Sequence, residues 1–163
     1  MSDHTRSPEW LVRQLFEVCI NDGRIDLLED IIAEDFIDAR GRRGPASVAS
    51  FIREIRAAFP DIYYTLEEII VEGDRLALLW NWKGTHVGPF QGFPATGKQV
   101  FVTGLAIFRC RDGRIASYRL LPDRLAFYEQ IGALPEGFAS GGMSPDQREA
   151  AAGANAAKGV FAR

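Results

Sequence analysis

Apolar residues recur at helical spacing through the first third of the chain. The first run begins at Ser7, which can cap a helix, and Pro8, which suits a first helical turn, and it continues to Cys19. A second run covers roughly Ile25–Ala33 and a third covers Ser47–Ala58, with a loop rich in arginine and glycine between them. The pattern predicts three N-terminal helices.

After Asp61 the spacing changes to that of strands. Four runs are rich in β-branched and aromatic residues, namely Ile62–Val71, Arg75–Trp82, Val100–Arg109 and Ile115–Leu121. The pair Asp112-Gly113 between the last two runs is a hairpin signal of the kind that needs positive φ. A loop rich in glycine and proline fills roughly residues 85–99, and a last helix near Arg124–Ile131 ends at Gly132. We therefore expect four strands of one antiparallel sheet.

Helices followed by strands indicate an α+β fold. We expect a cone-shaped domain over residues 8–134, in which three N-terminal helices pack on a strongly curved antiparallel sheet. Residues 135–163 form an Ala/Gly-rich C-terminal extension that is too poor in large apolar side chains to build its own core. Its segment Ser144-Pro145-Asp146-Gln147 is typical of a capped helix start. We interpret this extension as a mobile segment or an arm over a neighbouring molecule.

Composition and charge narrow the partners. The chain has 163 residues, a formal net charge of −3 and 47% hydrophobic residues, which suits one domain with a core and a cavity. It has no block of basic residues for nucleic acid or an anionic membrane surface, and no apolar run of about 18 residues. A cytoplasmic protein is expected. Cys19 and Cys110 are interpreted as buried thiols without a disulfide or a metal.

The candidate chemistry is limited by the side chains available. The chain has two histidines, His4 and His86, and no phosphate loop, zinc cluster or nucleophile elbow, so neither a metal nor a cofactor is expected. A carboxylate in an apolar cavity suits acid–base work, and Asp123, after the last strand, is the first candidate. The residues alone favour a different role for it, the cap of the helix that follows. Arg119, four residues earlier, could pair with Asp123 and hold it ionised.

A second group of candidates surrounds the glycine-rich loop. His86 could polarise a carbonyl group, or it could be a loop residue bonded to backbone. Asp38 and Asn81 are weaker polar candidates, and we expect Asp38 to be a solvated loop acid. A cavity for a flat apolar ligand, or simply the core, could be lined by Trp80, Trp82, Phe90, Phe93 and Tyr118.

An ordered string of motifs adds a family resemblance. The most informative pieces are Phe59-Pro60-Asp61, Gly84-Thr85-His86, Pro94-Ala95-Thr96-Gly97-Lys98, Asp112-Gly113-Arg114-Ile115, Asp123 and Gln130-Ile131-Gly132. Together they resemble the SnoaL-like polyketide cyclase (ester cyclase) family of the nuclear transport factor 2-like superfamily, over roughly residues 8–134. The resemblance implies a curved sheet closed by helices, a homodimer and no cofactor.

The resemblance also implies a reaction. In such cyclases the aspartate that matches Asp123 is the acid/base for an intramolecular aldol ring closure of a polyketide ester. The chain departs from the family pattern at Arg119, where the family often has Trp, and at Ser117, Tyr118 and Ala39, which replace Glu, His and His. These changes fall on the expected pocket rim.

The sequence therefore predicts a cofactor-independent enzyme that cyclises or isomerises a small hydrophobic carbonyl compound through an enolate. Asp123 would be base and then acid, and His86 or Tyr118 would stabilise the enolate oxygen. The apolar body of the substrate would contact Trp80, Trp82, Phe90, Tyr118 and Arg119. The alternatives are an epoxide-opening hydrolase or cyclase using the Arg119/Asp123 pair, a non-catalytic small-molecule-binding domain, and a dimerising domain whose cavity is filled by side chains.

Overall fold

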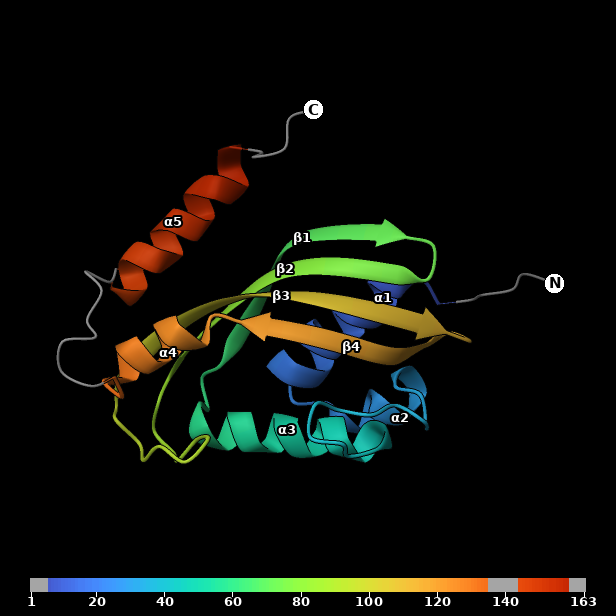
Figure 1. Cartoon of the computed structure of the whole chain (residues 1–163), viewed down its shortest axis with the longest axis horizontal. Coiled ribbons are helices and arrows are strands. Elements are labelled where there is room, and N and C mark those ends of the chain that lie inside the picture. Colours follow the sequence, from blue (N-terminus) through green and yellow to red (C-terminus); the bar gives the residue numbers. More distant parts are fainter. Residues whose placement is uncertain (1–5, 135–143, 159–163) are drawn as a thin grey trace.

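Helices come first in the chain and lie along one side of the sheet that follows them (Figure 1). The computed structural model describes residues 6–134 and 144–158. Within these residues, none of the helices combines the length and apolar character needed to cross a membrane. The predicted α+β fold is confirmed, and its four-stranded sheet is open rather than closed into a barrel.

Two helical stretches joined end to end open the chain. α1 (Pro8–Arg13) begins where the Ser7 hydroxyl accepts a hydrogen bond from the Trp10 amide at 3.1 Å, as the sequence predicted. It continues into a π-helical stretch, η1 (Gln14–Asn21). The side chains that η1 buries are Leu15, Phe16, Cys19 and Ile20.

The second predicted helix is shorter and less regular than expected. A 3₁₀ turn, η2 (Ile25–Leu27), precedes a single α-helical turn, α2 (Leu28–Ile31), whereas the sequence pattern extends to Ala33. The third predicted helix, α3 (Gly44–Ala58), begins at Gly44 rather than Ser47 and ends where expected. α3 is the long helix that faces the sheet across the interior (Figure 1).

The four predicted strands are confirmed and pair antiparallel in chain order. They are β1 (Tyr63–Glu72), β2 (Arg75–Thr85), β3 (Gln99–Arg111) and β4 (Arg114–Pro122). Asp112 and Gly113 join β3 to β4 with φ values of 52° and 69°, the positive-φ turn that the sequence predicted.

One face of the sheet is buried and the other is exposed. Alternate residues of β2, from Leu76 to Trp82, are almost fully buried and face the helices. On the opposite face of β3, Leu105 and Ile107 are 54% and 55% exposed. The core therefore lies between the helices and the inner face of the sheet.

Two further helices follow the sheet. α4 (Arg124–Ile131) ends at Gly132, whose φ of 78° closes the helix as predicted. α5 (Pro145–Lys158) starts with the predicted capping box, since the Ser144 amide donates to Gln147 Oε1 and the Gln147 amide donates to Ser144 Oγ.

α5 is tied to the rest of its own chain. Arg148 pairs with Glu129 of α4 at 3.0 Å, and Glu149 pairs with Lys83 of β2 at 2.7 Å. These contacts connect part of the expected extension to the sheet and to α4. Residues 135–143 and 159–163 of that extension lie outside the described residues.

Candidate active site

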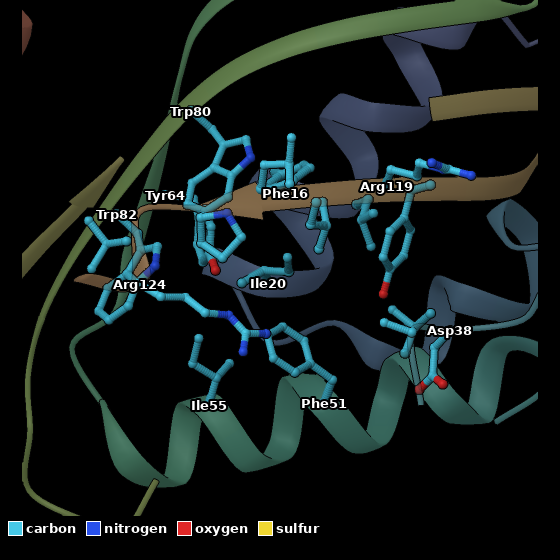
Figure 2. A pocket seen from close by; sticks show the side chains of 18 of the residues that line it. Phe16, Ile20, Asp38, Phe51, Ile55, Tyr64, Trp80, Trp82, Arg119 and Arg124 are labelled. Carbon is cyan, nitrogen blue, oxygen red and sulfur yellow. The ribbon is translucent and has the colours of Figure 1, made fainter. Parts of the chain in front are cut away.

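A pocket of about 510 Å³ lies between α3 and the inner face of the sheet (Figure 2). The alternative of an interior filled by side chains is therefore wrong. The walls of the pocket are mainly aromatic and aliphatic, with polar groups at intervals. This combination is typical of small-molecule sites. The side chains that matter below are Phe51, Ile55, Tyr64, Trp80, Trp82, Phe90, Tyr118, Phe127, Asp38, Arg119, Asp123 and Arg124.

The strand register explains how Trp80 reaches the pocket wall. Trp80 of β2 lies opposite Gly104 of β3, and Gly104 lies opposite Pro122 of β4. A Cβ at Gly104 would overlap the Trp80 indole ring, so the glycine leaves the space in which the ring lies. The indole therefore leans across β3 toward the strand that leads to Asp123.

Three of the other expected aromatic residues, Trp82, Phe90 and Tyr118, also line the pocket, whereas Phe93 is absent from the lining and packs against Tyr128. Trp82 and Phe90 are 4% and 5% exposed, and Trp82 packs against Phe127 with ring centroids 6.3 Å apart. Tyr118 packs against Phe108. Burial, and then the negative charge of Asp38, raise the pKa of the Tyr118 hydroxyl above its ordinary value. Contact of Trp82, Phe90 and Tyr118 with a substrate stays a prediction.

Asp123 both caps α4 and borders the pocket. Its Oδ1 accepts a hydrogen bond from the Ala126 amide at 2.9 Å, and its own amide donates to the Thr103 carbonyl of β3 at 2.9 Å. The cap interpretation is confirmed. In the described part of the chain no group donates to Oδ2, so the second carboxylate oxygen is available to a ligand.

The expected ion pair between Arg119 and Asp123 is not formed among the described residues. Four residues of extended chain span about 13 Å, which separates the two side chains. The register also places Arg119 opposite Ile107, whose side chain is on the outer face. Figure 2 shows the Arg119 side chain extending away from Arg124. Arg119 thus borders the pocket without pointing into it.

Asp38 is not the solvated loop acid that the sequence suggested. Its side chain is 8% exposed and accepts hydrogen bonds from the amides of Arg40 and Arg42 and from Arg42 Nε, each at 2.8 Å. Burial opposes ionisation, but these donors outweigh it and lower the pKa of Asp38 below its ordinary value. Its carboxylate is occupied by its own turn.

Asn81, the other weaker candidate, does not line the pocket. Its side-chain amide donates to Glu67 Oε1 across β1 and β2. Glu67 occupies the position where the pairing of these strands shifts register.

His86 lies behind the pocket wall. It is fully buried, it is absent from the pocket lining, and its ring stacks on Phe59 with centroids 5.0 Å apart. Nδ1 lies 3.1 Å from Thr96 Oγ1, while Nε2 has no hydrogen-bond partner in the described part of the chain. Burial lowers the pKa of the imidazole below its ordinary value.

The sequence motifs around His86 are joined by hydrogen bonds and close packing. Asp61 accepts hydrogen bonds from the Thr85 amide and hydroxyl, each at 2.7 Å, and a Cβ at Gly84 would lie 3.2 Å from Phe59 Cβ. Burial of Asp61 is outweighed by the Thr85 hydrogen bonds, which lower the pKa of its carboxyl. We call this unit the loop clasp: Phe59, Asp61, Gly84, Thr85, His86 and Thr96.

Sequence reasoning missed several pocket residues, of which Arg124 and Tyr64 bring polar groups. Figure 2 shows Arg124, the first residue of α4, reaching into the pocket toward Phe51. Tyr64 of β1 is buried beside Trp80, with ring centroids 5.5 Å apart, and burial raises the pKa of its hydroxyl. The alternation of β1 could have indicated Tyr64, whereas no sequence signal separates Arg124 from a solvated helix residue.

No metal site is suggested by the polar side chains that are described. Among residues 6–134 and 144–158, no group of three or more His, Cys, Asp or Glu side chains could hold a metal ion. The functional groups that line the pocket are carboxylates, guanidinium groups, phenols, indoles and one carboxamide.

Comparisons with known proteins place this geometry in context. The profile of a family described as SnoaL-like polyketide cyclase matches residues 10–131. The chain is 32% identical over 143 residues to aklanonic acid methyl ester cyclase DauD of Streptomyces sp. (strain C5), covering 78% of this chain and 85% of that protein. It is 28% identical over 119 residues to the nogalonic acid methyl ester cyclase of Streptomyces nogalater, covering 69% and 88%.

A solved structure is also similar to this chain in its fold. The structure of TsrD from Streptomyces laurentii matches the chain with a TM-score of 0.71 and 28% identity, over 79% of this chain and 100% of that one.

Proposed function

Because the chain belongs to the SnoaL-like polyketide cyclase family, as its motifs predicted, we propose that it closes a ring in a polyketide-type ester through an enolate, with Asp123 as the base. The observation that carries the proposal is the position of Asp123. One oxygen of its carboxylate caps α4, which fixes the side chain, and the other accepts no hydrogen bond from the described residues. Asp123 is an exposed residue that borders the apolar pocket.

The pocket supports a flat, apolar substrate. Its volume of about 510 Å³ falls within the range of small-molecule sites, and the indoles of Trp80 and Trp82 offer surfaces for stacking on fused rings. DauD and the Streptomyces nogalater relative are named as cyclases of aklanonic and nogalonic acid methyl esters. We therefore choose aklanonic acid methyl ester as the first test substrate.

The proposed reaction needs one proton acceptor and no co-reactant. Asp123 Oδ2 removes a proton from the carbon activated by the neighbouring carbonyl groups, and the electron pair of that C–H bond spreads onto a carbonyl oxygen. The carbanion then attacks the ketone carbon, which forms the ring bond and leaves an alkoxide. Asp123 returns its proton to that alkoxide. A positioned base of this kind contributes roughly 10²- to 10⁴-fold to rate.

The replacement Asp123→Asn tests the proposal. Asparagine caps a helix about as well as aspartate, so the fold is retained while the base is lost. Turnover of aklanonic acid methyl ester, followed by chromatography of the product, should fall by roughly 10²-fold or more. Asp112→Asn in the exposed β3–β4 turn is the matched control and should match the wild type, because asparagine tolerates positive φ.

Two results would contradict the proposal. Turnover by the Asp123→Asn variant within about twofold of the wild type would remove Asp123 as the base. A wild-type protein that binds both methyl esters without converting either would favour the non-catalytic binding domain. The epoxide-opening alternative has lost its supporting observation, because Arg119 and Asp123 do not pair among the described residues.

A further inference from the structure

An arginine that forms no ion pair lies beside Asp123 at the pocket. Within the described residues, the Arg124 guanidinium forms no ion pair or hydrogen bond. Arg124 is an exposed residue, so its charge is free to meet a ligand. The Trp80 Nε1–H also has no partner among these residues, but it is fully buried and does not reach the open pocket.

The other arginines at the pocket are engaged or turned away. Arg42 pairs with Asp38 at 2.8 Å, and Arg40 pairs with Glu54 at 3.1 Å. Arg119 extends along the edge strand, away from Arg124 (Figure 2). Arg124 is thus the cation that the described pocket presents to a ligand, and it reaches in between apolar side chains such as Phe51 and Ile55.

The backbone places Arg124 beside the carboxylate. Arg124 directly follows Asp123, and both residues line the pocket. Figure 2 shows the Arg124 side chain extending into the pocket toward Phe51. The positive charge and the proposed base therefore border the same cavity.

We propose that Arg124 binds the substrate oxygen that becomes negative when Asp123 removes the proton. This inference rests on the proposed function for the identity of that oxygen. The electron pair released from the C–H bond moves to the carbonyl oxygen, where a charged donor stabilises it. When the ring bond forms, the pair returns to carbon and the carbonyl group is restored. The pocket therefore selects substrates with an oxygen able to carry negative charge next to the reacting carbon.

A binding experiment tests the anion site without relying on turnover. The probe 2-hydroxy-1,4-naphthoquinone is ionised at neutral pH and resembles an enolate, whereas its methyl ether is neutral and has almost the same shape. Isothermal titration calorimetry should show the wild type binding the anion at least about tenfold more tightly than the ether. Arg124→Gln should abolish that preference, and Arg124→Lys should retain part of it.

An arginine outside the pocket provides the control. Arg53→Gln removes an exposed arginine of α3 outside the pocket lining and should keep the preference, and melting curves check that each variant is folded. Equal binding of both probes, binding of neither, or an unchanged preference in Arg124→Gln would overturn the inference.

Turnover separates this inference from the proposed function. With aklanonic acid methyl ester, Arg124→Gln should lower kcat by roughly 10²- to 10³-fold and change KM only a few-fold, because the charge exists only during reaction. Normal kcat in Arg124→Gln, with an inactive Asp123→Asn variant, would overturn the role of Arg124 and leave the cyclase intact. An Arg124-dependent preference for the anion in a protein that converts no ester would instead support the site and contradict the cyclase.

Discussion

Single residues set the shape of this pocket through the space they leave. Gly104 is the clearest case, because the Trp80 indole occupies the volume that any side chain at this position would need. Trp80 in turn forms an apolar part of the pocket wall. The glycine is therefore part of the candidate site, although it offers no functional group.

Gly104→Ala should narrow the pocket and destabilise the fold. The added methyl group forces the indole out of its position, and overpacking of this kind costs about 1–3 kcal/mol. Chemical denaturation should show that loss, together with weaker binding of 2-hydroxy-1,4-naphthoquinone.

Gly153→Ala in α5 is a control with the opposite expected sign. A methyl group there meets open space, and alanine should stabilise the helix by up to about 1 kcal/mol. Equal stability of the Gly104→Ala variant and the wild type would show that Trp80 moves without cost.

At the scale of elements, the loop clasp fixes the segment between β2 and β3. Asp61 after α3 receives both hydrogen bonds from Thr85, and His86 stacks on Phe59 at the end of the same helix. Phe59 also packs against Trp82 and Phe90, which line the pocket. The motifs in the clasp thus support the side chains that line the pocket.

His86 should make stability depend on pH. Burial lowers its folded-state pKa below the ordinary value of 6.5, so the unfolded chain binds the proton more readily. The contribution of the neutral imidazole is fully present above pH 6.5 and is lost as the pH falls toward the lower folded-state pKa. Melting temperatures measured between about pH 8 and pH 5 should decline more in the wild type than in His86→Gln.

The other histidine provides the control for this titration. His4→Gln should keep the wild-type pH profile, because this variant retains the buried His86 whose titration is tested. If His86→Gln instead keeps the wild-type stability profile and loses turnover, the structural interpretation of His86 fails and the catalytic role predicted from sequence gains support.

At the scale of the whole molecule, the outer face of the sheet is unusually apolar. Ile70, Leu105, Ile107 and Leu121 lie on three strands of this face and are 60%, 54%, 55% and 73% exposed. Large exposed apolar patches usually mark interaction surfaces. The homodimer expected from the family resemblance stays a prediction, and this face is the surface on which we place it.

Ile107→Lys should convert the expected dimer into a monomer. A lysine at the centre of a two-fold interface faces its own copy, and burying that charge without a partner disfavours association. Light scattering coupled to size-exclusion chromatography should give a wild-type mass near twice 18.1 kDa and a single-chain mass for the variant.

Val87→Lys, on the exposed loop after β2, is the matched control and should leave the mass unchanged. A wild-type protein that elutes as a monomer at every concentration would contradict the dimer.

Most of the fold was predictable because its signals are local. The Ser7 cap, the Asp112-Gly113 turn, the Gly132 helix end and the Ser144 capping box each depend on residues a few positions apart. The second helix was predicted too long, because apolar spacing alone does not show where the backbone hydrogen bonds stop. The family motifs are likewise readable in order along the chain.

The sequence by itself determined the order of the elements, the family and the carboxylate that caps α4 at the pocket. Only the tertiary structure decided which side chains face that pocket. A register shift near Cys110 places Tyr118 opposite the inward-facing Phe108 and sends Arg119 outward. Packing against Phe59 places His86 behind the pocket wall. The Arg124 side chain, in contrast, reaches into the pocket. These outcomes depend on strand register and on contacts between residues far apart in the chain, which local spacing does not encode.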